Sequence, residues 1–128
     1  MNLRRNVVGT TEHATSVFKK LNRMVYEPVR FMILEKLIAA GQVDFSYLAK
    51  AIRHEIDLTD GNLAGHLLRL ENARYIKAKR QYRGRRHTTF YSVTDKGKRT
   101  FEWFLIGLAK RLQESSKITD IKLKLSSN

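Results

Sequence analysis

A run of basic side chains in the middle of the chain has the clearest chemistry in this sequence. Seven basic residues fall within thirteen positions, and no acid occurs between Glu71 and Asp95; the seven are Arg74, Lys77, Lys79, Arg80, Arg83, Arg85 and Arg86. Guanidinium and ammonium groups at this density bind phosphate polymers through charge-assisted hydrogen bonds and counterion release. A solvated basic face is the alternative interpretation. The missing acids favour an anion-binding surface.

Candidate catalytic and metal-ligating residues are sparse. There is no cysteine, which excludes disulfides, thiolate zinc sites and a cysteine nucleophile. The four histidines, His13, His54, His66 and His87, fall on separate predicted elements without metal-ligand spacing. The pair His54-Glu55 lies in a predicted turn, where solvation explains it. We therefore expect no enzyme, no cofactor and no metal.

The overall composition points to a folded protein with a polyanionic partner. The 128 residues are 42% hydrophobic and carry a formal net charge of +13. Residues 59–99 hold 11 basic and 3 acidic side chains, so the excess is concentrated there. No apolar run approaches the roughly 18 residues of a membrane span, and no signal-peptide core opens the chain. We expect one cytoplasmic domain with no membrane partner.

Hydrophobic periodicity and capping residues predict the elements that position the basic run. Helices are expected over 11–26, from Glu27-Pro28 to Gly41, from a Ser46 cap to Ile52, from a Thr59 cap to about Ala73, and from Thr94-Asp95 to about Gln113. Short strands are expected at 43–45, 75–79 and 88–93, the last two forming a hairpin around Arg83-Gly84-Arg85-Arg86. The tail after Gln113 could be a strand, a docked segment or disordered.

This order predicts a mainly α fold with a small β-hairpin, of α+β class: a winged helix-turn-helix with additional N- and C-terminal helices. The predicted units are an N-terminal arm and helix at 1–26, the winged helix-turn-helix at 27–99, and a C-terminal helix and tail at 100–128. An α-helix fits the major groove of B-form DNA, so helix 59–73 is expected there. The basic wing, about 75–93, is expected on the minor groove or on phosphates.

The sequence resembles the winged-helix transcriptional regulators of bacteria and archaea, near the MarR and ArsR superfamilies. The residues that carry the resemblance are VDFSYLAKAI at 43–52, LTDGNLAGHLLRLENARYIKAKR at 58–80 and GRRHTTFYSVTDKGK at 84–98. It covers roughly 27–105 and implies a homodimeric, sequence-specific DNA-binding repressor or activator. The chain departs from related sequences at three places. A Ser-Arg pair is common where it has Ala64 and Gly65, and a basic residue is common where it has Leu68. Glycine is usual where it has Arg74.

Candidate DNA-binding residues follow from the predicted exposed faces. On the helix they are Thr59, Asp60, Gly61, Asn62, Gly65, His66 and Arg69. On the wing they are Lys79, Arg80, Arg83, Gly84, Arg85 and Arg86. Asn62 could pair with adenine or complete the helix cap, and Arg69 could reach guanine or phosphate. His66 flanks the apolar ridge, where a packed histidine bonded to backbone is the simpler interpretation than a base reader.

Surplus apolar residues at both ends of the chain predict a homodimer. Trp103 and Ile106 cannot share the packed face of one helix with Phe104, and the N-terminal helix carries Val17, Phe18 and Leu21. The alternative is that the N-terminal helix folds back on its own domain. A small-molecule effector is possible and unidentified. Alternative functions are a low-specificity architectural DNA- or RNA-binding protein, or a winged-helix protein-interaction module.

Overall fold

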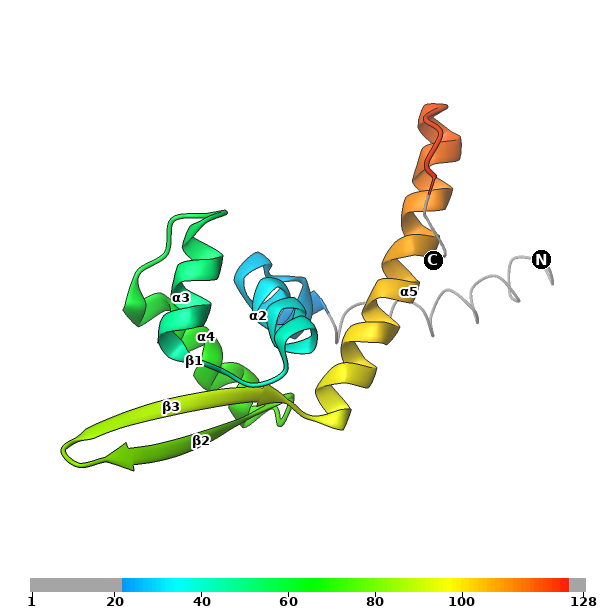
Figure 1. The fold of residues 1–128 in the computed structure, drawn as a ribbon. Helices are drawn as coiled ribbons and strands as arrows, with labels where there is room; N and C mark the ends of the chain where they lie inside the picture. The colour runs from blue at the N-terminus through cyan, green and yellow to red at the C-terminus, as the bar shows by residue number, and fades with distance from the viewer. Residues whose placement is uncertain (1–21, 125–128) are drawn as a thin grey trace.

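The structure, a computed structural model, describes residues 22–124 (Figure 1). Its elements are a π-helical turn η1 (Asn22–Tyr26), α2 (Pro28–Ala40), β1 (Val43–Asp44), α3 (Phe45–Arg53), α4 (Asp60–Asn72), β2 (Ile76–Arg83), β3 (Arg86–Val93) and α5 (Asp95–Thr119). This order confirms the expected α+β fold. Most of the helix expected at 11–26 lies outside the described residues, and so do Val17, Phe18 and Leu21.

Side-chain and backbone caps set the ends of the first helices. The Glu27 carboxylate accepts the Arg30 backbone N–H at 2.9 Å, and Pro28 opens α2, where its missing N–H costs nothing. Gly41 ends α2 with a φ of 87°, a conformation that favours glycine. The α3 cap is Asp44, whose carboxylate accepts the Tyr47 N–H at 2.8 Å, so the prediction of a Ser46 cap was wrong.

The three strands form one antiparallel sheet in the order β1-β3-β2. The helix α3 begins directly at Phe45, so β1 stops one residue earlier than predicted. β2 and β3 are both longer than predicted, and their ladder continues to the pair Arg83 and Arg86. The apolar alternation fades toward the tip because both faces of the ribbon are exposed there, while the backbone pairing persists. The turn is Gly84-Arg85, with a φ of 64° at Gly84.

The core lies where α2, α3, α4 and the first half of α5 meet. α4 contributes three buried leucines at positions 63, 67 and 70, as its periodicity predicts. From α5, Phe101 and Phe104 pack on Phe31 of α2, with ring centroids 5.0 and 6.0 Å away. α4 packs on α2 through its leucine ridge, so its other face is left exposed.

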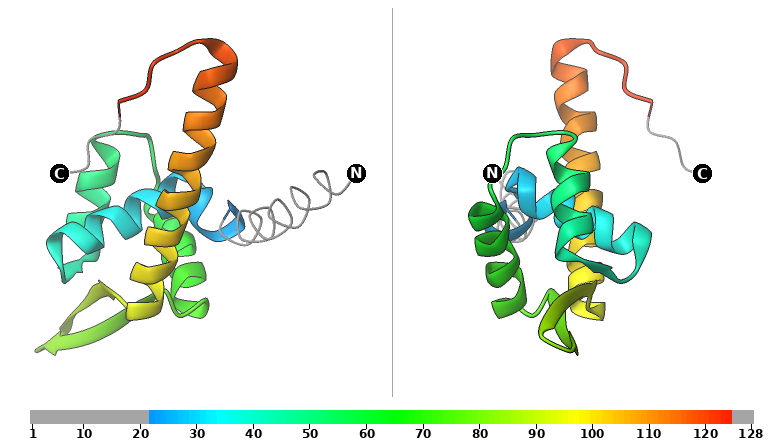
Figure 2. Two further views of the ribbon diagram at one scale, coloured as in Figure 1. Left: turned by 90° about the vertical axis from the view of Figure 1, so that its right-hand side faces the viewer. Right: turned by 60° about the vertical axis from the view of Figure 1, so that its left-hand side comes forward.

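The helix α5 is longer than predicted and its second half projects from the body (Figures 1 and 2). It runs without interruption across the unit boundary predicted at residue 100. Polar residues continue the helix past Gln113, and Asp120 ends it in the left-handed conformation with a φ of 60°. Residues 121–124 have no regular structure. Within residues 22–124, no helix is long and apolar enough to cross a membrane.

Candidate nucleic-acid interface

The helix α4 presents an exposed face that is held in place by its cap and its leucines. Thr59 Oγ1 accepts the Asn62 backbone N–H at 3.1 Å, so the predicted cap is present and uses the backbone of Asn62. Gly61, Asn62, Gly65 and Arg69 are all exposed, together with Leu68 at 56%. The cap and the buried ridge therefore fix a short face of small and polar groups at the start of the helix.

Asp60, a predicted DNA-binding residue, is engaged by its neighbour across the turn. The Arg53 guanidinium forms an ion pair with the Asp60 carboxylate and also donates to the Leu58 carbonyl at 2.8 Å. Arg53 thus offsets the negative charge that Asp60 exposes at the N-terminal start of α4. The pair also holds the turn between α3 and α4 in one shape, which sets the angle between the two helices.

The strand register sorts the basic side chains of the hairpin. Residues directly opposite each other in an antiparallel pair share one face, and alternate residues change face. The face opposite the buried Ile76 thus carries Lys77 and Lys79, and Arg83 joins it with its partner Arg86. Four cations share one face of the ribbon. Arg80 lies on the other face, with Ile76.

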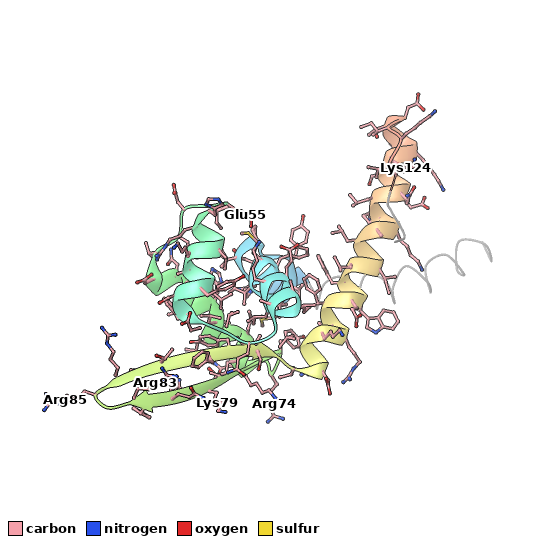
Figure 3. The ribbon with its side chains drawn as sticks, viewed as in Figure 1. Glu55, Arg74, Lys79, Arg83, Arg85 and Lys124 are labelled. Carbon is pink, nitrogen blue, oxygen red and sulfur yellow. The ribbon has the colours of Figure 1, made fainter. Side chains whose placement is uncertain are left out.

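The end of the hairpin is exposed and carries its own polar groups. Arg85 occupies the turn, and the rings of Tyr82 and His87 pair across the strands with centroids 5.6 Å apart. Figure 3 shows Arg85 at the tip, Arg83 and Lys79 along the ribbon and Arg74 at its base. The hairpin is thus a projecting ribbon with cations from base to tip.

The end of α4 is tied directly to the beginning of α5. The N–H groups of Arg74 and Tyr75 bond the carbonyls of Glu71 and Leu70, at 2.9 and 3.0 Å, which is the Schellman pattern. The Thr94 hydroxyl donates to the Arg74 carbonyl at 2.7 Å. A Cβ on Gly97 would lie 2.0 Å from the Tyr75 carbonyl oxygen, so only glycine allows this approach. Any shift of α5 therefore reaches the C-terminal end of α4.

Residues 29–120 match the model of the winged helix DNA-binding domain. The chain belongs to this family. The resemblance to winged-helix regulators is confirmed. By their places in this fold, α4 is called the recognition helix and the β2–β3 hairpin the wing.

Similar proteins come from archaea and bacteria. The chain is 32% identical over 77 residues to the uncharacterized protein MJ0432 of Methanocaldococcus jannaschii, covering 60% of this chain and 79% of that protein. It is 27% identical to a transcriptional regulator homologue of Pyrococcus horikoshii, with a TM-score of 0.66, covering 77% of this chain and 96% of the other. A PadR family transcriptional regulator of Eggerthella lenta shares the fold at 18% identity, with a TM-score of 0.63. The match covers 90% of this chain and 99% of the other.

The structure turns His66 away from the exposed face of the recognition helix. Its side chain is 16% exposed and faces Glu27 and Arg30, with Nδ1 at 3.5 and 3.2 Å from Glu27 Oε2 and Arg30 Nη1. The expectation of a packed histidine bonded to backbone was wrong in its partners, which are side chains. Sequence reasoning missed Glu27 and Arg30. The sequence signal that could have indicated them is Arg30, a lone arginine beside the apolar stripe of α2.

The described part of the chain has one open hollow beside the recognition helix and no cluster of metal-ligating side chains. Residues 22–124 hold no group of three or more His, Asp or Glu placed to bind a metal ion. An open hollow of about 380 Å³ lies between α3 and the first turn of the recognition helix, where Lys50, His54 and Asp60 are among its lining residues. A small-molecule effector stays a prediction.

The turn after the recognition helix, where the resemblance leads us to expect glycine, holds Arg74 with a φ of 65°. Residues with a Cβ pay a steric penalty of about 1–2 kcal/mol in this region. We expect Arg74→Gly to raise the free energy of unfolding by about 0.5–1 kcal/mol, since the freer unfolded chain offsets part of the gain. Urea denaturation measures it. Arg74→Ala is the matched control, which keeps the Cβ and should bring no gain; equal stabilisation by both would contradict the explanation.

Proposed function

We propose that this winged helix protein is a sequence-specific transcriptional regulator that binds double-stranded DNA as a homodimer. The observation that carries the proposal is the register of the wing, which gathers Lys77, Lys79, Arg83 and Arg86 on one face. This ribbon follows the C-terminal end of the recognition helix, which buries its leucine side in the core and exposes the other side. A DNA duplex offers a groove to such a helix and phosphates to such a ribbon.

In this proposal the recognition helix lies in the major groove with its first turns toward base edges. Asn62 is the candidate base reader, because its backbone serves the cap and its side chain lies on the exposed face. Arg69 lies two turns later and faces phosphate or guanine. The wing arginines contact phosphates, and Arg85 at the tip can enter the minor groove.

Exposed apolar side chains on α5 support the homodimer. Trp103 is 59% and Ile106 is 52% exposed, although both are large apolar residues on a helix that projects from the body. Pairing such faces about a two-fold axis removes them from water. Dimeric DNA-binding proteins of this kind place their two recognition helices about 34 Å apart, one turn of DNA, so we expect an operator with two symmetric half-sites.

Titrations of the full chain against duplex DNA at several salt concentrations test the proposal. Sequences selected from a random pool should bind about a thousand-fold or more tightly than random duplex, with affinity falling steeply as salt rises. Sedimentation should show two chains per operator. Affinity that does not depend on salt would exclude a phosphate-binding surface, and a monomer on a single half-site would exclude the dimer.

A low-specificity architectural role is the second candidate, and the recognition helix itself favours it. Ala64, Gly65 and Leu68 stand on its exposed part and offer no polar group to a base edge. The same competition separates the two functions, because an architectural protein would show a specificity ratio near one. A protein-interaction module would instead bind duplex DNA weakly under all of these conditions.

A further inference from the structure

A polar cluster lies on the inward side of the recognition helix. Arg30 of α2 is only 7% exposed; its Nε donates to the Met24 carbonyl of η1 at 2.7 Å and its Nη1 lies 3.2 Å from Nδ1 of His66. The Glu27 carboxylate caps α2 through the Arg30 N–H and lies 3.5 Å from the same His66 nitrogen. The cluster therefore joins η1, the start of α2 and the middle of α4.

Stability alone gives a weak reason for such a cluster. Moving a guanidinium out of water costs free energy, and replacing buried ion pairs with apolar residues of similar volume is often neutral or stabilising. Arg30 is buried next to Val29, on a helix whose other buried residues, Ile33, Leu34 and Leu37, are apolar. What a buried polar cluster can add is a definite geometry, because its hydrogen bonds form in only one arrangement of the elements that carry it.

That geometry bears on the DNA-facing residues of the recognition helix. His66 and the exposed Arg69 are three residues apart on α4, so they lie on neighbouring turns of one rigid element. A rotation of α4 that breaks the contact between Arg30 and His66 also moves Arg69 relative to a bound duplex. The residues that hold His66 can therefore set where Arg69 points.

We propose that Arg30 and His66 are positioning residues for DNA recognition, holding α4 against α2 in the orientation in which it reads the groove. The inference rests on the proposed function. Neither residue touches DNA in this arrangement, because Arg30 is buried and His66 faces α2. Both act through the placement of the recognition helix.

The protonation state of His66 decides which partner it binds. As a neutral ring, Nδ1 accepts a hydrogen bond from the Arg30 guanidinium; once protonated, the same nitrogen donates to the Glu27 carboxylate and repels Arg30. Burial lowers the pKa of His66 below its ordinary value of 6.5, an effect that Glu27 opposes and that Arg30 and Arg69 reinforce. His66 is therefore neutral at pH 7.5 and holds Arg30.

Acidification should consequently weaken DNA binding through His66. Because the pKa of His66 is lowered in the folded chain, the contact between neutral His66 and Arg30 is complete above about pH 6.5 and is lost as the pH falls through the pKa of the folded protein. We expect the affinity of the wild type, divided by that of His66→Gln, to fall about threefold or more as the pH is lowered from 7.5 until His66 is protonated. Glutamine keeps an acceptor and a donor but does not titrate, so it removes the contribution of the other histidines from the comparison.

Salt titrations of Arg30→Lys and Lys79→Ala separate positioning from phosphate contact. A lysine keeps the charge of Arg30 but lacks the planar fork that reaches Met24 and His66 from two different nitrogens. We therefore expect about a fivefold loss of affinity, the size of a typical coupling between contacting residues, with an unchanged salt slope. Lys79→Ala should lower the slope by about one unit, because it removes a phosphate contact.

The outcomes distinguish this inference from the function on which it rests. Wild-type affinity in Arg30→Lys, a reduced salt slope in that variant, or an affinity ratio for His66→Gln that stays constant while His66 becomes protonated would overturn the positioning role. An unchanged slope in Lys79→Ala would count against the wing as a phosphate-binding surface. Circular dichroism confirms folding; if Arg30→Lys does not fold, the pH comparison with His66→Gln decides the question.

Discussion

Replacing Arg83, Arg85 and Arg86 together with alanine is expected to lower the affinity for duplex DNA by about a hundred-fold near physiological salt. Each phosphate contact of an exposed cation contributes about 1 kcal/mol, and 1.4 kcal/mol corresponds to a factor of ten. The three residues occupy the turn and the last strand pair of the wing, where the cations meet no described acidic partner. The slope of log affinity against log salt should also fall by about 2 to 3 units.

Fluorescence anisotropy of a labelled duplex at several salt concentrations measures both quantities. The matched control is the triple alanine variant at Arg111, Lys122 and Lys124, which removes the same charge from exposed positions on and after α5. A general effect of net charge would weaken both variants equally. That result would contradict the assignment of the wing, whereas a loss confined to the first variant would support it.

Gly97→Ala is expected to destabilise the fold by about 3 kcal/mol or more. The added Cβ would lie 2.0 Å from the Tyr75 carbonyl oxygen and 2.8 Å from its carbonyl carbon, and both are backbone atoms that cannot rotate aside. The clash can be relieved only if α5 moves away from the turn after α4. This movement breaks the bonds of the Thr94 hydroxyl to the Arg74 carbonyl at 2.7 Å and to the Tyr75 carbonyl at 3.1 Å.

Chemical denaturation of the two proteins measures this loss, and Gly107→Ala is its matched control. Gly107 lies in the same helix, and a Cβ there meets nothing within 4 Å. Alanine at that position should therefore stabilise α5 by about 0.5–1 kcal/mol through its helix propensity. Similar effects of the two substitutions would show that the approach of Gly97 to Tyr75 is not what requires glycine.

Local signals in the sequence were sufficient for the order and nature of the elements. The caps at Thr59 and Thr94, the leucine spacing of the recognition helix and the apolar alternation of the strands all act within a few residues, so they can be recognised without tertiary contacts. The positions predicted for the ends of these elements were less accurate. The wing and α5 both extend beyond their apolar signal, because backbone hydrogen bonding continues through exposed polar residues that periodicity does not detect.

The sequence by itself determined the class of the protein, because the uncompensated cations and the capped helices are properties of neighbouring residues. Only the tertiary structure decided which groups act together. Strand register placed Arg83 and Arg86 on one face, and the packing of α2 against α4 brought Arg30 to His66 across 36 positions of the chain. Such pairings depend on how separate elements pack and align, and no pattern within a single element records that alignment.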